Sequence, residues 1–410
     1  MRPRIAVAVT TFALTASFAP HVANALDGVG GDERRAAAAQ SRVAVSESYP
    51  VPGNGRYQVR GHGYGHGHGM SQWGAQGAAL AGQGYRQILD FYYPGTDLGR
   101  ARKKVRVLIT GDTTSDVVVL ATDGLLVRDR GTMTDYPLPT NPTRWRIDPG
   151  AGNADVVQKW NGSSWRDWRT LEGEGEFRAP GPIALVKPSE TVRYRGALRA
   201  VQPTAGSTSR DTVNVVTLDQ YVKGVVPSEV YTSWEPAALQ AQAVAARTYA
   251  AFERADNRDR YYQICDTSSC QAYGGVDKEV QSTNDAVDAT ARRILTYGGE
   301  PAFTQFSASS GGWTSDGGYP YLPEKADPWD DTPGNPSHSW STTITATAIR
   351  NHYPAIGALQ RIRVTQRNGH GAWQGRVLSM TLVGRQGSRT LTGDDFRSAF
   401  GLRSNWFTFG

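Results

Sequence analysis

Long apolar runs are scarce in this sequence of 410 residues, and basic residues form no long runs. After residue 25 no stretch resembles a membrane helix, so we expect no membrane span in the mature protein. The formal charge of +6 is mild, and without Lys/Arg clusters it argues against nucleic-acid binding. With 39% hydrophobic and 20% charged residues, the chain is typical of a globular protein with one large or two modest cores.

Cysteine is also scarce: the sequence has only Cys265 and Cys270, within CDTSSC. A zinc site needs three or four ligands. In an exported chain a pair this close is expected to form a small disulfide loop, and zinc at the pair is the less favoured alternative. We therefore expect no cofactor.

The stretch GHGYGHGHG places His62, His66 and His68 between glycines. In an extended segment all three would project from one face, because all sit at even positions. This pattern suggests a metal site, but no carboxylate or cysteine stands near the histidines in the sequence. We therefore favour hydrogen-bonding roles for the histidines and tight backbone turns at the glycines.

The first 25 residues have the features of a secretion signal: Arg2 and Arg4, an apolar stretch over residues 5–19, and a small-x-small cleavage site over residues 23–25. We expect the mature protein to be secreted, either extracellular or associated with the cell wall. Residues 26–55 are rich in small and polar residues and are interpreted as a flexible linker.

Hydrophobic periodicity predicts an α+β fold. Helical spacing is found over residues 85–92, and short apolar runs separated by turn residues predict a β-rich region from residue 105 to about 217. Ser233 as N-cap and Pro236 in the first turn predict an alanine-rich helix to about residue 254, whose small side chains suggest burial. A second helix is expected from residue 281 to the turn at Gly298.

Glu229 and Arg247 are the candidate reactive residues. Glu229 has apolar sequence neighbours, and a carboxyl held among apolar groups prefers its neutral form, as a general acid at neutral pH requires. A capping or surface role is the alternative. Arg247 sits in an otherwise small and apolar helix, so a buried guanidinium there needs an anionic or carbonyl partner. A structural ion pair and a contact with substrate or a catalytic carboxylate both fit the sequence.

Residues 306–318, FSASSGGWTSDGG, offer hydroxyls and backbone amides on a glycine-rich loop. Such a loop lets polar ligands approach closely. It lacks the pattern of a serine nucleophile elbow or a phosphate loop, so we interpret it as a polar binding loop.

The segment YVKGVVPSEVYTSWEPAALQAQAVAARTYA closely resembles the core motif of the SpoIID/LytB family, bacterial wall proteins involved in peptidoglycan remodelling and, in spore formers, engulfment. CDTSSCQAYGG, SASSGGWTS with the later YPYL, and GDDFRSAFGLRSNWF resemble its other blocks in the expected order. The resemblance extends from about residue 105 to the end.

The segment GHGYGHGHGMSQWGAQGAALAGQGYRQILDFYYPGT, residues 61–96, also resembles a family block, which the family places after the F-R-x-x-x-G-L segment. We interpret the altered order as a circular permutation, which predicts that residues 61–96 pack beside the C-terminal strand. The implied organisation is a signal peptide (1–25), a flexible linker (26–55), a permuted block packed on the catalytic domain (56–98), a β-rich part (99–215) and a catalytic core (216–410).

The resemblance implies a lytic transglycosylase that cleaves MurNAc-GlcNAc strands without adding water and leaves 1,6-anhydro ends. The family's glutamate falls on Glu229 and its important arginine on Arg247. The motifs also imply an extended sugar cleft with these substrate-binding residues: His66, His68, Gln72, Tyr249, Gln271, Tyr273, Ser309, Ser310, Gly311 and Gly312.

A second function implied by the resemblance is non-catalytic. LytB-type relatives enhance an N-acetylmuramoyl-L-alanine amidase, so the fold would serve as a wall-binding activator with a cell-wall amidase as partner. Tolerance of Glu229→Gln would distinguish this activator from the enzyme. Some relatives bind zinc at a cysteine pair with nearby histidines, but no histidine lies between His68 and His338 here, so the ligand set is incomplete.

Overall fold

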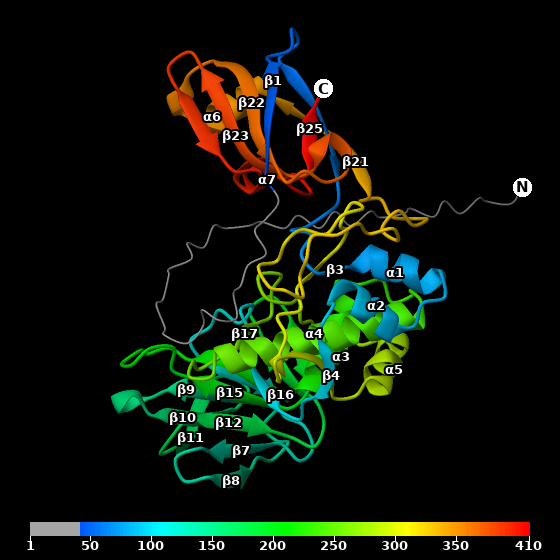
Figure 1. The fold of residues 1–410 in the computed structure, drawn as a ribbon. Coiled ribbons are helices and arrows are strands. Elements are labelled where there is room, and N and C mark those ends of the chain that lie inside the picture. Colours follow the sequence, from blue (N-terminus) through cyan, green and yellow to red (C-terminus); the bar gives the residue numbers. More distant parts are fainter. Residues whose placement is uncertain (1–41) are drawn as a thin grey trace, which may run out of the picture.

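The computed structural model describes residues 42–410. The signal peptide expected over residues 1–25 lies outside the described residues. Figure 1 shows two lobes joined by loops. We call residues 70–307 the central lobe, residues 43–62 with 339–410 the terminal lobe, and residues 63–69 with 308–338 the junction. Within the described chain, no helix combines the length and apolarity needed to cross a bilayer.

Two mainly antiparallel sheets form the base of the central lobe (Figure 1). In β5 (Lys104–Leu108) buried valines alternate with more exposed residues, the pattern of a strand with one face on a core. One sheet has the order β17-β5-β16-β15-β12-β7-β8 and the other β11-β10-β9-β6-β13-β14. Their other strands are β6 (Val117–Leu120), β7 (Leu126–Asp129), β8 (Thr134–Pro137), β9 (Arg144–Pro149), β10 (Asp155–Trp160), β11 (Trp165–Thr170), β12 (Gly175–Arg178), β13 (Ile183–Val186), β14 (Thr191–Tyr194), β15 (Ala197–Val201), β16 (Asp211–Thr217) and β17 (Ile264–Cys265).

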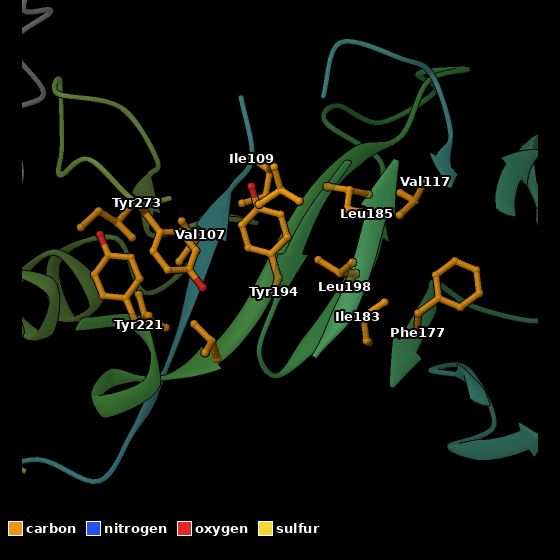
Figure 2. Packing of buried hydrophobic residues seen from close by; sticks show 14 of the residues in the cluster. Val107, Ile109, Val117, Phe177, Ile183, Leu185, Tyr194, Leu198, Tyr221 and Tyr273 are labelled. Atoms are coloured by element: carbon orange, nitrogen blue, oxygen red, sulfur yellow. The ribbon is translucent and has the colours of Figure 1, made fainter. Parts of the chain in front are cut away.

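One buried hydrophobic cluster joins both sheets to the helices above them. It includes Val107 from β5, Ile183 from β13 and Ala246 from α4. Figure 2 shows this packing, with Tyr221 and Tyr273 at the end of the cluster nearest the helices. The helices are α1 (Gln72–Leu80), α2 (Tyr85–Tyr92), α3 (Leu218–Glu229), α4 (Pro236–Asp256), α5 (Gln281–Ala289), α6 (Ala346–His352) and α7 (Gly393–Phe400).

The alanine-rich helix α4 is the centre of the helical layer, and its small side chains are buried as predicted. Pro236 opens the helix, but Glu235 and not Ser233 occupies the N-cap position, so the expected cap is wrong by two residues. The predicted second helix is also too long. It ends at Ala289, because Arg292 adopts φ 65° and residues 293–297 form the strand β18.

The terminal lobe combines segments from both ends of the described chain (Figure 1). One sheet has the order β1-β22-β23-β24 and the other β21-β2-β25. The flexible linker expected up to residue 55 is therefore wrong over residues 43–50, which form β1 and pair with β22. These strands are β1 (Val43–Pro50), β2 (Arg56–His62), β21 (Ser339–Thr345), β22 (Leu359–Arg367), β23 (Val377–Gly384), β24 (Ser388–Leu391) and β25 (Phe407–Phe409).

Two small sheets connect residues 70–100 to the rest of the central lobe. One is β19-β18-β4 and the other pairs β20 with β3. In the second, Met70 lies opposite Phe306 and Ser71 opposite Ser307. These strands are β3 (Met70–Ser71), β4 (Asp97–Arg100), β18 (Arg293–Tyr297), β19 (Glu300–Pro301) and β20 (Phe306–Ser307).

Strand β2 pairs directly with β25, which confirms that the glycine-histidine block begins beside the C-terminal strand. Val59 lies opposite Phe409, and Gly61 lies opposite Phe407. The structure is thus α+β and β-rich, as predicted. Circular permutation relative to the family, and the domain boundaries given above, remain predictions.

Phe407→Ala should destabilise the terminal lobe, because Phe407 is fully buried in the cluster that also contains Val59 and Phe396. The expected cost is about 3–5 kcal/mol in the free energy of unfolding, measured by urea denaturation. Ser341→Ala, on the exposed face of β21, is the control and should change stability by less than about 0.5 kcal/mol. Equal effects of the two variants would contradict this packing.

Candidate active site

Glu229 is the last residue of α3. Thr217 caps the start of this helix by accepting a hydrogen bond from the Gln220 N–H, and the helix ends where Val230 becomes extended, with φ −134° and ψ 163°. The Glu229 side chain is half-buried. Its Oε1 accepts a hydrogen bond from the Ala272 N–H at 2.7 Å. The carboxyl is therefore held in position and partly open to solvent.

Burial raises the pKa of Glu229 above its ordinary value, and the hydrogen bond from Ala272 opposes the shift without cancelling it. Val225 and Val226, in the preceding turn of α3, are fully buried. The direction of the shift agrees with the expectation from the sequence, because burial disfavours a charged carboxylate. A carboxyl with such a pKa can donate a proton closer to neutral pH than an exposed glutamate.

The segment that carries Ala272 is fixed on both sides. A disulfide joins Cys265 to Cys270, and the hydroxyl of Tyr273 donates to Asn214 Oδ1 at 2.9 Å. Gln271 accepts a hydrogen bond from the Tyr221 hydroxyl through Oε1 at 3.2 Å and donates from Nε2 to the Ala246 carbonyl. Gln271 and Tyr273, both predicted to bind substrate, are buried and orient the backbone beside Glu229.

The disulfide confirms the expected pairing of Cys265 and Cys270. Because both sulfur atoms are bonded to each other, neither is available as a thiolate ligand, and the pair does not fit a zinc ion. Within residues 42–410, no group of three or more His, Cys, Asp or Glu side chains is placed to hold a metal ion.

A cavity of about 320 Å³ lies beside the same segment, since Tyr273 and Gly274 form part of its wall. Tyr194 from β14 and Asp266 from the disulfide loop also line it. The other lining residues are Lys187, Glu190, Thr191, Val192, Asp277 and Lys278. The walls are mixed polar and apolar. The extended sugar cleft expected from the sequence remains a prediction.

Arg247 is fully buried and forms an ion pair from Nε to Asp219 Oδ1 at 2.7 Å. Its guanidinium also donates to the carbonyls of Arg293 at 3.1 Å and Val287 at 3.2 Å. Among the described residues no hydrogen bond or ion pair joins Arg247 to Glu229. Arg247 therefore holds α3, α5 and β18 against α4, which is the structural ion pair that the sequence left open.

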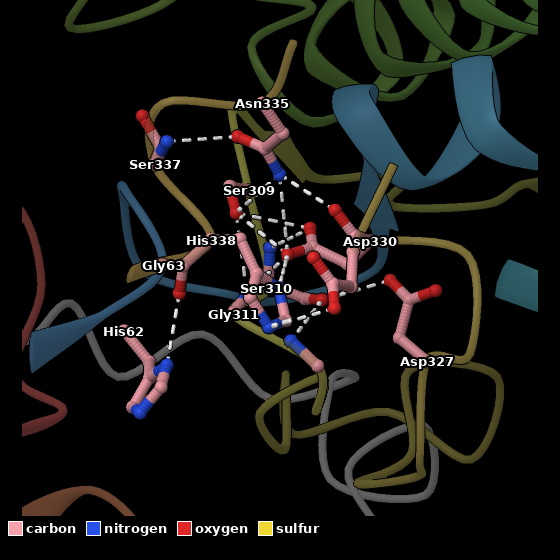
Figure 3. A network of polar contacts seen from close by, with 12 residues as sticks. His62, Gly63, Ser309, Ser310, Gly311, Asp327, Asp330, Asn335, Ser337 and His338 are labelled. Atoms are coloured by element: carbon pink, nitrogen blue, oxygen red, sulfur yellow. Dashed lines mark hydrogen bonds and ion pairs between the residues drawn. The ribbon is translucent and has the colours of Figure 1, made fainter. Parts of the chain in front are cut away.

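The predicted loop residues Ser309, Ser310, Gly311 and Gly312 lie in a buried polar network in the junction (Figure 3). The Asp330 carboxylate accepts hydrogen bonds from the Ser309 hydroxyl and from the backbone N–H groups of Ser310 and Gly311, all at 2.9–3.0 Å. The Gly312 N–H donates to Ser310 Oγ at 3.2 Å. These hydroxyls and amides are therefore engaged inside the protein.

Two further segments donate to the same carboxylates. Ser71, the N-cap of α1, donates to Asp330 Oδ1 at 2.7 Å, and His338 Nδ1 lies 2.9 Å from Asp330 Oδ2. Asp327 accepts from the Tyr92 hydroxyl at 2.9 Å and from the Ser310 hydroxyl at 2.8 Å. The network thus joins α1, α2, the glycine-rich loop and the start of β21.

The two aspartates differ in pKa. Burial would raise the pKa of Asp330, but hydrogen bonds from His338, Ser71 and Ser309 outweigh it and hold the pKa below its usual range. Burial and the neighbouring Asp330 charge raise the pKa of Asp327 to about 6. The hydrogen bond to Asp330 raises the pKa of His338, so this histidine and Asp330 form an ion pair at moderately acidic pH.

Sequence reasoning missed Asp327, Asp330 and His338. They lie in ADPWDDTPGNPSH, where prolines, a glycine and polar residues indicate only a loop. No periodicity marks these side chains as buried. One feature could have indicated them. If the neighbouring loop of serines and glycines is buried, its hydroxyl and N–H donors need acceptors inside the protein.

His66 and His68 also belong to the junction. Their rings lie 4.6 Å apart, and His68 Nδ1 is 3.1 Å from Gln305 Oε1. Burial lowers the pKa of both histidines. Among the described residues no contact joins either of them to Glu229, so their expected place in the wall of the active site remains a prediction.

The other two predicted substrate-binding residues lie on different helices, Gln72 on α1 and Tyr249 on α4. Gln72 is buried in the first turn of α1, and Tyr249 stacks on Phe303 with ring centroids 5.4 Å apart. Helix α1 nevertheless reaches the segment after Glu229, because Gln76 Oε1 accepts a hydrogen bond from the Glu235 N–H at 2.9 Å. Residues 61–96 therefore contact the Glu229 region through α1.

Glu229→Gln should be more stable than the wild type at neutral pH. The amide oxygen can still accept from Ala272, whereas the raised pKa makes ionisation of Glu229 costly in the folded state. As the pH rises above 4.5, the ordinary pKa of a glutamate, the wild type should lose stability relative to the variant. Below that pH the free energies of unfolding of the two proteins should converge. Urea denaturation across this range measures the difference. Glu229→Ala, which leaves the Ala272 N–H without its acceptor, should be less stable than Glu229→Gln.

His338→Ala should destabilise the junction by about 1–3 kcal/mol at about pH 5.5, because it removes a hydrogen bond to the buried Asp330 carboxylate. The pKa of His338 is raised, so its contribution is fully present below its ordinary value of 6.5 and is lost as pH rises through the folded-state pKa. Urea denaturation at about pH 5.5 and about pH 9 checks this. If the difference in unfolding free energy between wild type and variant is the same at both pH values, His338 and Asp330 do not form a charged pair.

The family model of SpoIID, described as Stage II sporulation protein, matches residues 191–297. Stage II sporulation protein D of Bacillus subtilis is 28% identical over 225 residues, which cover 48% of this chain and 61% of that protein. The amidase enhancer of Bacillus subtilis is 35% identical over 129 residues, covering 30% and 17% of the two chains. An uncharacterized protein of Brachyspira hyodysenteriae is 42% identical over 103 residues, covering 25% and 28%.

The matches span less than two thirds of the length of each of these relatives. The segment matched by the family model runs from β14 to β18 and contains Glu229, Arg247 and the disulfide. The terminal lobe and the Asp330 network lie outside it. Residues 191–297 are therefore similar to the SpoIID domain, and the relatives named Stage II sporulation protein D and amidase enhancer support a place for this chain in the SpoIID/LytB family.

Proposed function

We propose that this chain is a secreted peptidoglycan lytic transglycosylase in which Glu229 is the acid and base. It would act in cell-wall remodelling or sporulation. The observation that supports the proposal most strongly is the setting of Glu229: a half-buried carboxyl with a raised pKa, fixed at the end of α3 within the segment similar to the SpoIID domain. Proteins named for sporulation and for enhancing an amidase are among its relatives, which favours a role at the cell wall.

A single carboxyl can carry out both proton transfers of this reaction. Protonated Glu229 first gives its proton to the glycosidic oxygen as the bond to the MurNAc anomeric carbon breaks. The resulting carboxylate then takes the proton of the MurNAc C6 hydroxyl, whose oxygen bonds to the anomeric carbon. The products are a 1,6-anhydro end and a free hydroxyl on GlcNAc, and Glu229 is protonated again.

The surroundings of Glu229 suit this scheme better than ordinary hydrolysis. Glycoside hydrolases use two carboxyls on either side of the scissile bond. No second carboxyl among residues 42–410 contributes to the pKa shift of Glu229, whose causes are burial and the Ala272 hydrogen bond. Arg247 would act indirectly, since it fixes α3 through Asp219 and thereby the position of Glu229.

The second candidate function is a non-catalytic activator of a cell-wall amidase. It is favoured by the 35% identity with the amidase enhancer of Bacillus subtilis. In that case the protein would bind peptidoglycan and an amidase, and the Glu229 carboxyl would not need to ionise or transfer a proton.

Peptidoglycan digestion with wild type and Glu229→Gln distinguishes the two functions. Purified protein is incubated with intact peptidoglycan and with glycan strands freed of stem peptides, and the fragments are analysed by mass spectrometry. The wild type should release 1,6-anhydro ends, and Glu229→Gln should lose at least about 100-fold in rate, because proton transfer by a positioned acid contributes that much or more.

Glu235→Gln is a matched control, since Glu235 is an exposed carboxyl in the segment that follows Glu229. It should release products at the wild-type rate. Fragments carrying an added water would indicate hydrolysis instead. Absence of products from the wild type, combined with stimulation of an amidase by both wild type and Glu229→Gln, would support the activator.

A further inference from the structure

Three aromatic side chains meet beside the segment that follows Glu229. Trp73 comes from α1, and Tyr231 and Trp234 come from the connection between α3 and α4. The Trp73 ring lies 4.9 Å from the Trp234 ring and 5.8 Å from the Tyr231 ring, and the last two lie 5.6 Å apart. We call these residues the aromatic triad.

The triad is open to solvent in a way that core aromatics are not. Tyr231 is 59% exposed, and both tryptophans are only half-buried. Trp145, by contrast, is fully buried and donates its indole N–H to the Pro139 carbonyl. Among the described residues, neither Trp73 nor Trp234 donates its indole N–H to a protein acceptor. The triad therefore offers both aromatic faces and free hydrogen-bond donors.

The triad is also held in place. The Gln76 side chain, one turn after Trp73 in α1, accepts a hydrogen bond from the Glu235 N–H. The Thr232 carbonyl accepts a hydrogen bond from the Ser282 hydroxyl at 2.7 Å, and the backbone N–H of Trp234 donates to the Tyr231 carbonyl at 3.1 Å. A surface fixed in this way loses little conformational entropy when it binds a ligand.

The connection to Glu229 is short. Only Val230 separates Glu229 from Tyr231, so their Cα atoms are within about 7 Å. Helix α3 ends at Glu229 and the chain becomes extended at Val230, so Tyr231 lies at the start of the connection that leaves the carboxyl. A sugar unit next to a bond placed at the Glu229 carboxyl is therefore within reach of Tyr231.

We propose that the aromatic triad is a saccharide-stacking surface that binds an N-acetylhexosamine unit of the glycan next to Glu229; this rests on the proposed function. The C–H groups of a pyranose face are weakly positive and pack against the negative face of an aromatic ring. The indole N–H groups and the Tyr231 hydroxyl can donate to sugar hydroxyl and acetamido oxygens. Exposed indoles and a phenol fit an uncharged, hydroxyl-rich ligand better than a charged one.

Glycan binding by Tyr231→Ala tests the proposal without requiring turnover. All proteins carry Glu229→Gln so that no bond is cleaved, and calorimetric titration measures the affinity for a GlcNAc tetramer and for glycan strands freed of stem peptides. Tyr231→Ala should weaken binding by about three- to tenfold, the loss of one aromatic contact. Tyr231→Phe should retain most of the affinity, because the ring remains.

Tyr297→Ala is the matched control, since Tyr297 is an exposed tyrosine of β18 whose ring contacts Tyr321 and not the triad. It should bind glycan like the parent protein. Thermal unfolding should be the same for Tyr231→Ala and the parent, because the removed side chain is mostly in water.

The outcomes separate this proposal from the reaction. Weaker glycan binding by Tyr231→Ala supports the surface even if the wild type releases no 1,6-anhydro ends. Unchanged binding overturns the surface even if the wild type is an active transglycosylase. If the parent binds neither ligand, the saccharide assignment is wrong. It is also wrong if Tyr231→Ala binds glycan normally but fails to stimulate an amidase, and in that case the triad is a protein-docking site.

Discussion

The buried Asp330 carboxylate is the interaction that joins the central lobe to the junction. It accepts hydrogen bonds from the N-cap of α1, from the glycine-rich loop and from His338 at the start of β21. A buried carboxylate without these donors would carry a large desolvation penalty, so each segment is favoured where it can reach Asp330. Gly63 and Gly311 allow the approach: both have positive φ, and a Cβ on either would crowd the backbone of the other segment. Helix α1, and with it Trp73, is thereby fixed against the junction.

Asp330 and Glu229 show how one functional group acquires opposite properties from its surroundings. Asp330 is surrounded by donors, so its charged form is stabilised and its pKa is lowered. Glu229 has a single donor, the Ala272 N–H, and burial dominates, so its neutral form is favoured. The first arrangement suits a structural anchor and the second suits proton transfer. The fixed loop around Ala272 maintains this difference, since more donors at Glu229 would lower its pKa.

Features set by local sequence were predicted well. The alternating valines of β5, the alanines of α4 and the five-residue spacing of Cys265 and Cys270 each contain their own signal, and the structure agrees with them. The raised pKa of Glu229 followed from its apolar neighbours. The N-cap at Glu235 differed from the expected Ser233 because helix ends are set by the path of the entering chain as well as by capping propensity.

Features that depend on distant partners were missed. The sequence of β1 has the composition of a linker. Its strand conformation depends on pairing with the distant β22 and on the ion pair between Glu47 and Arg367. The end of α5 is set by the pairing of β18 with β4, which overrides the helical propensity of the alanine and arginine residues that follow Ala289. The donors of the glycine-rich loop were identified correctly, but they serve Asp330 inside the protein. Burial of a loop cannot be read from its composition, which is why the direction in which Ser309 and Ser310 point was not predictable.

The pairing of β2 with β25 also constrains the order in which the molecule folds. The Tyr49 and Thr408 hydroxyls, which bond across the terminal lobe, are separated by 359 positions in the sequence. Closing a loop of that length in an unfolded chain is slow and entropically costly. In the central lobe, hairpins such as β10-β11 join residues close in sequence. A folded central lobe shortens the effective loop between the two ends, so we expect the terminal lobe to form last, and during synthesis only after the final strand has left the ribosome.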